Sequence, residues 1–142
     1  MRAQAAVEYL SIVAISLAAL LPLWYFVSTS TDSVKQDLRV GSARQAVFKL
    51  RDAADLAYAQ GVPAEFLVEV NVPDGISSAS LYANEIVLQI SMGSRGTTDV
   101  FSVSIANLTG DISRMVYSPG LHLVRVKAQR GASGSTLVNV TD

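Results

Sequence analysis

Side chains that could support catalysis are few in this chain. It has one histidine, His122, and no cysteine. His122 stands in the strand-like stretch "GLHLVRV", where a lone histidine is typical of a surface or cross-strand position. Three acids are close to one another in sequence: Glu65, Glu69 and Asp74. The alternation of polar and apolar residues and a turn explain them as solvated positions. The sequence has no glycine-rich phosphate loop, paired-histidine metal motif or nucleophile elbow. We therefore expect no catalytic residue, no metal site and no cofactor.

One carboxylate has a different setting. Glu8 stands at the edge of an uncharged run from Tyr9 to Val27, roughly 19 residues that would span about 29 Å as a helix. This length approaches the ~30 Å hydrocarbon core of a bilayer and exceeds the usual core of a cleaved secretory signal, about 7–15 residues. The run predicts a membrane-inserting helix. Arg2 is the only base before it, which favours a cytoplasmic N-terminus and an external remainder.

Two glycosylation sequons follow in that external part, "NLT" at Asn107 and "NVT" at Asn139. Both are candidate N-glycosylation sites, although so short a motif also arises by chance. The formal net charge is −1, with acids and bases interspersed in every segment. No basic face emerges, and we expect no nucleic-acid partner.

A second helical pattern follows the uncharged run, and together they predict one long helix over residues 4–60. Its first half is hydrophobic and its second half amphipathic, with an apolar stripe at three- and four-residue steps: Val40, Ala43, Val47, Leu50, Ala54 and Tyr58. Gly61 and Pro63 should end the helix. Pro22 lacks a backbone donor, so we expect a kink or local melting there.

The period changes to two beyond the helix, which indicates strands. Six are expected, with turn residues between them, at 65–73, 85–92, 99–108, 112–118, 123–129 and 135–141. In the third, Phe101, Val103 and Ile105 alternate with Ser102 and Ser104. The fold class is therefore α+β, a long N-terminal helix followed by a C-terminal antiparallel β-sheet or β-sandwich head.

The segment "AQAAVEYL", followed by an uncharged run, resembles the N-terminus of type IV pilin-like subunits. The resemblance is closest to the archaeal class III signal-peptide pilin family. It implies a basic leader, residues 1–3, cut by a prepilin peptidase between Ala3 and Gln4, which makes Glu8 the fifth residue of the mature chain. Two features depart from the family pattern: Ala6 stands where it has serine, and the leader "MRA" is short. Bacterial Tad-type pilins and pseudopilins share similar starts and stay open as an alternative.

The resemblance also implies a function. The chain would be a glycoprotein subunit of an adhesion filament on the cell surface, stored in the membrane as a precursor and polymerised by pilus assembly machinery. Residues 4–60 would form the filament core and pack on the extracellular head, residues 61–142. Gln4 and Glu8 would act in assembly, because a carboxylate in an apolar bundle is tolerated where it meets the new α-amino group. The alternative is a monomeric, single-span, membrane-anchored extracellular β-domain for binding.

Overall fold

The computed structural model describes residues 2–93, 96–131 and 134–142. Helix α1 spans Arg2–Gln60, and strands follow it. The expected α+β class, with a long apolar helix before a strand-rich part, is confirmed. The chain forms two compact units, Met1–Asp37 and Leu38–Asp142, and the boundary between them falls within α1. The last part of the helix therefore belongs with the strands.

Helix α1 ends where the sequence predicts. Gly61 follows its last residue with φ of 70°, a left-handed conformation that glycine adopts without steric cost. The Gly61 N–H donates a hydrogen bond of 3.0 Å to the carbonyl of Ala57. This bond satisfies one of the carbonyls that a helix end leaves without a partner, as in the αL cap.

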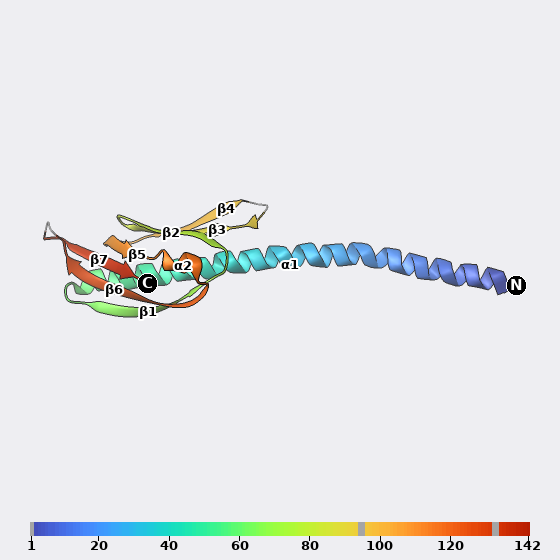
Figure 1. The fold of residues 1–142 in the computed structure, drawn as a ribbon, viewed down its shortest axis with the longest axis horizontal. Coiled ribbons are helices and arrows are strands. Elements are labelled where there is room, and N and C mark those ends of the chain that lie inside the picture. Colours follow the sequence, from blue (N-terminus) through green and yellow to red (C-terminus); the bar gives the residue numbers. More distant parts are fainter. Residues whose placement is uncertain (1, 94–95, 132–133) are drawn as a thin grey trace. The chain divides into compact units, whose positions relative to one another are not determined.

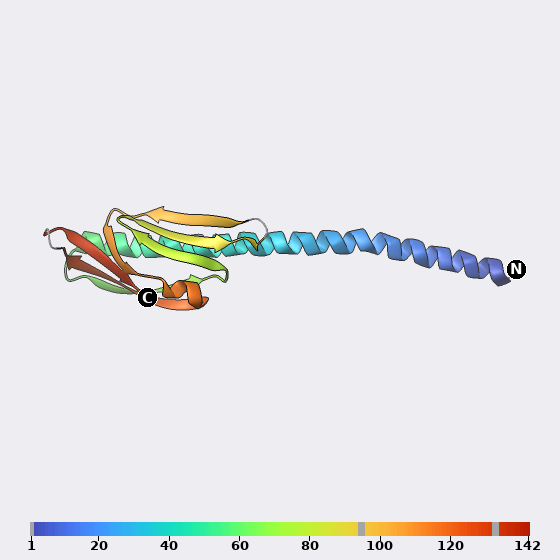
Figure 2. The same ribbon diagram turned by 45° about the horizontal axis from the view of Figure 1, so that its top comes forward.

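Over the described residues of the second unit, seven strands form two sheets (Figures 1 and 2). One sheet has the order β1-β6-β7-β5 and the other β2-β3-β4. The strand pairs are antiparallel except β5 and β7, which are parallel, so the expectation of a purely antiparallel sheet is wrong at this pair. The bounds are β1 (Glu65–Val72), β2 (Ile76–Tyr82), β3 (Glu85–Ser91), β4 (Thr97–Val103), β5 (Asn107–Asp111), β6 (Gly120–Arg130) and β7 (Thr136–Thr141).

Three local expectations are wrong. Residues 112–118 do not form a strand, because Arg114–Tyr117 is the short helix α2. Strand β2, with the sequence "ISSASLY", was not expected, since serine and alanine give a weak strand pattern. The residues between the expected third and fourth strands, 109–111, are not a turn but belong to β5. Gly110 in that stretch has φ of 121°, and a Cβ atom there would lie 2.0 Å from the Val140 carbonyl oxygen, so close pairing with β7 requires glycine.

The core of the second unit contains a stripe of α1 together with inward side chains of both sheets. The expected positions Ala43, Val47, Leu50 and Ala54 are each 0% exposed. Tyr58 is instead 39% exposed, and the stripe is completed by the small residues Ala46 and Ala57.

Within this unit, α1 contacts one edge strand of each sheet. The Arg51 guanidinium donates a hydrogen bond of 3.5 Å to the Ser102 hydroxyl of β4. The Lys49 ammonium donates one of 3.4 Å to the backbone carbonyl of Glu69 in β1. At the opposite edges, the Leu108 N–H of β5 donates to the carbonyl of Ala83, just after β2. The last part of α1 is thus bonded to an edge strand of each sheet (Figure 2).

Two of the three apolar side chains of β4, Phe101 and Val103, lie outside, whereas Val100 is buried in the core. Phe101 and Val103 are 59% and 54% exposed, whereas Ser102 and, just after the strand, Ser104 are buried. Apolar residues of a strand with one solvated face usually point into the core. The inversion has a local cause, because the inner side of β4 lies against polar groups of α1: Ser102 contacts Arg51, and Ser104 contacts Asp55.

Candidate membrane-insertion and assembly segment

The first unit presents an exposed apolar surface. Over the described residues there is one helix, α1, that is long and apolar enough to cross a membrane. Its large side chains between Val7 and Val27 are exposed, Trp24 by 75% and Leu10 by 71%. Such a segment, with no charge from Tyr9 to Val27, is compatible with membrane insertion or a signal anchor. We call residues 9–27 the apolar segment.

Five serine and threonine hydroxyls in this unit form hydrogen bonds within the helix itself. The Ser11 hydroxyl donates to the carbonyl of Val7, and the Ser16 hydroxyl donates to that of Ile12. Each donor–acceptor distance is 2.8 Å. Thr29, Thr31 and Ser33 make the same four-residue contact farther along. A hydroxyl without a partner is costly in hydrocarbon, and back-bonding of this kind removes most of that cost. The hydroxyls of Ser11 and Ser16 are therefore compatible with an apolar environment.

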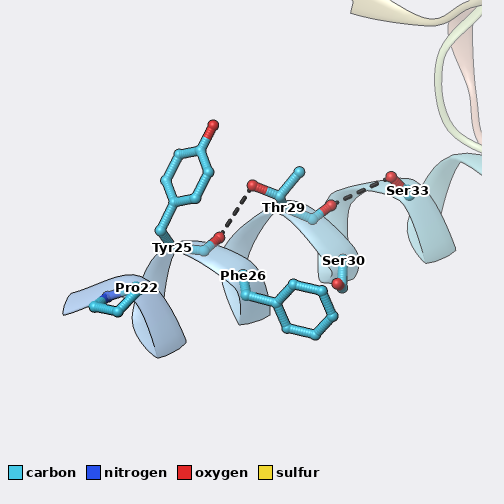
Figure 3. Close-up of a pocket in the computed structure, with 6 residues that line it drawn as sticks. All are labelled: Pro22, Tyr25, Phe26, Thr29, Ser30 and Ser33. Atoms are coloured by element: carbon cyan, nitrogen blue, oxygen red, sulfur yellow. Dashed lines mark hydrogen bonds between the residues drawn. The ribbon is translucent and has the colours of Figure 1, made fainter. Parts of the chain in front are cut away.

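Pro22 lies inside α1, and the helix continues through it. The local melting that the sequence suggested is therefore wrong, because neighbouring turns keep the helical backbone where the proline donor is missing. The kink stays a prediction. Beside Pro22 one side of the helix is hollowed, and Figure 3 shows the rings of Tyr25 and Phe26 pointing to different sides. The hollow is lined by Pro22, Tyr25, Phe26, Thr29, Ser30 and Ser33.

The residues expected to act in processing and assembly lie in the first turns of α1. Gln4 and Glu8 are both exposed and, being four residues apart in a helix, share one face. Met1 and the side chain of Ala3 lie outside the described part of the chain. The small side chains that would allow a neighbouring helix to approach are also exposed: Ala14, Ser16, Ala18 and Ala19.

His122 ties two chain segments together in the head. Its Nδ1 lies 2.6 Å from Asp142 Oδ2, and its Nε2 faces the Ser118 carbonyl oxygen. Both partners are oxygen acceptors, so a ring nitrogen that carries a proton can donate to the one it faces. The side chains of His122 and Asp142 are only 10% and 8% exposed. The expected surface or cross-strand role is thus replaced by a buried tie between the end of β7 and the loop before β6.

The three acids near β1 do not gather into one site. Glu65 lies 3.4 Å from both Arg125 and Lys127 of the neighbouring strand β6. Asp74, in the turn after β1, receives two hydrogen bonds from the Arg39 guanidinium, of 2.9 and 2.5 Å. These bonds, with the positive charge of Arg39, lower the pKa of Asp74. Within the described ranges, no three histidine, aspartate or glutamate side chains are grouped as metal ligands would be.

The two sequon asparagines differ in their surroundings. Asn107 begins the edge strand β5 and is exposed, whereas the expected third strand, residues 99–108, would have ended one residue after it. Asn139 lies in the middle of β7 and is half-buried. Its amide oxygen accepts a hydrogen bond of 2.6 Å from the Thr141 hydroxyl, the third residue of the same sequon. Asn107 is therefore the more accessible of the two.

Sequence reasoning missed a polar link between α1 and the strands. Asp55 Oδ1 accepts hydrogen bonds from the Ser104 hydroxyl at 2.5 Å and from the Ile105 N–H at 3.0 Å. The Ser104 hydroxyl oxygen accepts one from the Ala106 N–H at 3.0 Å. About 50 residues separate Asp55 from these partners, so no local pattern could reveal the contact. It fixes the chain between β4 and β5 to the helix.

In comparisons with known proteins, no family model, curated protein or solved structure matches the chain. The chain therefore has a strand-rich second unit, the head, and a first unit whose helix is compatible with membrane insertion.

Proposed function

We propose that the chain is the structural subunit of an archaeal type IV pilus-like filament that mediates surface adhesion and polymerises through α1. The observation that carries the proposal is the apolar segment, exposed and free of charge, preceded by Glu8 four residues after Gln4. Before assembly the segment would lie in the membrane. Assembly would then move the head to the outer surface of an extracellular filament.

The exposed surface of the apolar segment needs a partner outside this chain. Burying one large apolar side chain is worth about 1.5–3 kcal/mol, and more than ten such side chains of α1 are exposed between Val7 and Val27. Leaving them in water would therefore cost on the order of tens of kcal/mol. Lipid supplies the cover in the precursor, and helices of other copies supply it in the filament, so the exchange needs no aqueous intermediate.

In the proposal, Glu8 determines which helix registers are favourable in the filament. After a cut at Ala3, the α-amino group of Gln4 would be about 6 Å from Glu8 along the helix axis. An unpaired carboxylate inside an apolar bundle costs several kcal/mol, and an ammonium partner offsets much of this. Only helix registers that bring Glu8 to a terminal amine, its own or a neighbour's, would be favourable.

The test is assembly of Glu8→Gln, compared with Asp32→Asn as a matched control. Each full-length variant is expressed as the sole subunit in a cell with pilus assembly machinery, and sheared surface material is examined by electron microscopy. We expect Glu8→Gln to insert in the membrane normally but to yield about tenfold fewer filaments, whereas Asp32→Asn assembles as the wild type does. Wild-type assembly of Glu8→Gln would contradict the role of this carboxylate.

The same preparations distinguish the alternatives. A wild-type chain that stays in the membrane and never enters sheared filaments would support a monomeric anchored binding domain. N-terminal mass mapping of surface material should return Gln4 as the first residue, and a chain starting at Met1 would contradict processing by a prepilin peptidase. Intact mass of the native chain tests glycans at Asn107 and Asn139. A bacterial Tad-type or pseudopilin role would be favoured if only that type of machinery assembled the chain.

A further inference from the structure

The second unit has an apolar surface that the fold leaves uncovered. On the outer side of β2, β3 and β4, Val87 is paired with Phe101, and Glu85 is paired with both Val103 and Tyr82. Phe101, Val103 and Ile105 are 59%, 54% and 71% exposed. We call this surface the outer-sheet face; its residues are Tyr82, Val87, Phe101, Val103 and Ile105, with Glu85 and Asp99 as the charged residues.

The charged residues of the described strands β2, β3 and β4 have one sign. Glu85 and Asp99 are the acids of these described strands, and no arginine, lysine or histidine occurs in β2, β3 or β4. The Gln89 amide donates a hydrogen bond of 2.9 Å to Asp99, which fixes that carboxylate without neutralising it. A partner that covers the face should therefore combine apolar side chains with basic ones.

Such a surface occurs on the same unit, on the side of α1 opposite its buried stripe. Leu38, Phe48 and Leu56 are 65%, 40% and 49% exposed there, although all belong to a helix whose other side is fully buried. The Arg51 guanidinium lies 5.0 Å from the centre of the Phe48 ring. We call this surface the outer-helix face; it contains Leu38, Gln45, Phe48 and Leu56, with Arg44, Lys49 and Arg51 as bases and Asp52 as its acid.

We propose that the outer-sheet face of one copy docks on the outer-helix face of a second copy. Apolar residues meet apolar residues, and the two acids of the outer-sheet face meet Arg44 and Lys49, since Arg51 is already paired with Asp52 at 2.6 Å. The two faces differ, so the contact is heterologous and leaves a free face of each kind on the pair. Repetition then gives an open chain of heads rather than a closed dimer. The contact involves only the second unit, so it goes beyond the proposed packing of the apolar segment.

The absence of cysteine permits a direct test. Two full-length variants with different tags, Val103→Cys and Gln45→Cys, are expressed together in one membrane and treated with a short bifunctional maleimide. We expect a product that carries both tags, about tenfold more abundant than with Leu123→Cys in place of Val103→Cys. Leu123 is 64% exposed on the other sheet and serves as the matched control. Equal yields from the two pairs would overturn the proposal.

Charge reversal gives a second readout. Glu85→Lys with Asp99→Lys should abolish the two-tag product, and Arg44→Glu with Lys49→Glu on the partner should restore it. These positions are not in the core, and unchanged amide exchange in the strands would show that the head is folded. If Val103→Cys does not react with a water-soluble maleimide and also does not crosslink to Gln45→Cys, another molecule, such as lipid, covers the outer-sheet face. That result would overturn the proposal. Normal filaments without the two-tag product would contradict this contact alone; loss of filaments in Glu8→Gln tests the proposed function separately.

Discussion

The two parts of helix α1 bury their apolar side chains in different ways. In residues 9–27 large side chains such as Trp24 and Leu10 are exposed, whereas in residues 43–57 a narrow stripe of small and medium side chains is completely buried. The stripe finds its cover in the strands of the same chain. The apolar segment finds none there. The spacing of apolar residues in a helix therefore indicates which side chains need to be buried. Only the size and number of these side chains indicate whether the same chain buries them.

Polar groups differ in the same way between the two parts. Ser16, in the first part, bonds to a carbonyl of its own helix, four residues back. Asp55, in the second, bonds to Ser104 and Ile105 in the chain between β4 and β5. The first arrangement suits a helix that can be moved between surroundings, because no bond must be broken. The second fixes the helix to one set of strands.

The largest expected effect comes from placing a carboxylate in each part. Val47→Asp puts an unpaired charge among core residues and should lower the free energy of unfolding of the head by about 3–5 kcal/mol. Val13→Asp, in the apolar segment, should leave head stability unchanged but reduce membrane insertion. Chemical denaturation of the full chain in detergent, followed by strand amide exchange, checks the first effect, and membrane fractionation checks the second. A head equally stable in both variants would remove the distinction.

A smaller effect is expected from polar groups. Asp55→Ala removes the acceptor of the Ser104 hydroxyl and the Ile105 N–H, and should cost about 1–3 kcal/mol of head stability. Ser16→Ala removes a donor that only bonds to its own helix, so head stability should be unchanged. Amide exchange at Ile105 reports the first change directly. Protection of Ile105 that persists in Asp55→Ala would contradict the link.

Gly41 tests the helix near the junction of the two units. It lies in the interior of α1, and a Cβ atom added there would meet no atom within 4 Å. Gly41→Ala should therefore stabilise the detergent-dispersed chain by about 0.5–1 kcal/mol, because alanine loses less backbone entropy in a helix. The measurement is the denaturation midpoint. A lower midpoint would indicate that the helix bends or opens at Gly41.

The smallest effect should come from acid titration of the Arg39–Asp74 ion pair near the start of the second unit. Arg39 lowers the pKa of Asp74 in the folded chain. The pair therefore contributes stability above the unfolded pKa of about 3.9 and loses it as the pH falls through the lower folded value. Because both side chains are partly exposed, the contribution should be at most about 1 kcal/mol. Asp74→Asn should lower the melting temperature at pH 7 and leave it unchanged near pH 2; an equal loss at both would show that the charge is not its source.

The long helix, its end at Gly61 and strands β1, β3, β6 and β7 were predictable because periodicity and turn residues are local signals. The partners of strands are not local. Strand β5 looks like a turn until Gly110 is placed against Val140, and β4 points Phe101 outward because Asp55 and Arg51 stand on its inner side. The candidate assembly residues Gln4 and Glu8 were found from spacing. The outer-sheet face was not, because alternation alone does not say which side of a strand is inside.

The position of α1 between the strand edges has a mechanical consequence. Arg39 bonds to the turn after β1, and Asp55 bonds to the chain after β4, so two ties about 24 Å apart along the helix axis hold the same helix. A force that pulls the helix along its axis acts on both ties and on the buried stripe together, in shear. The contacts must then yield at once rather than one after another, as they would in peeling. A head held in this way would resist tension transmitted through α1.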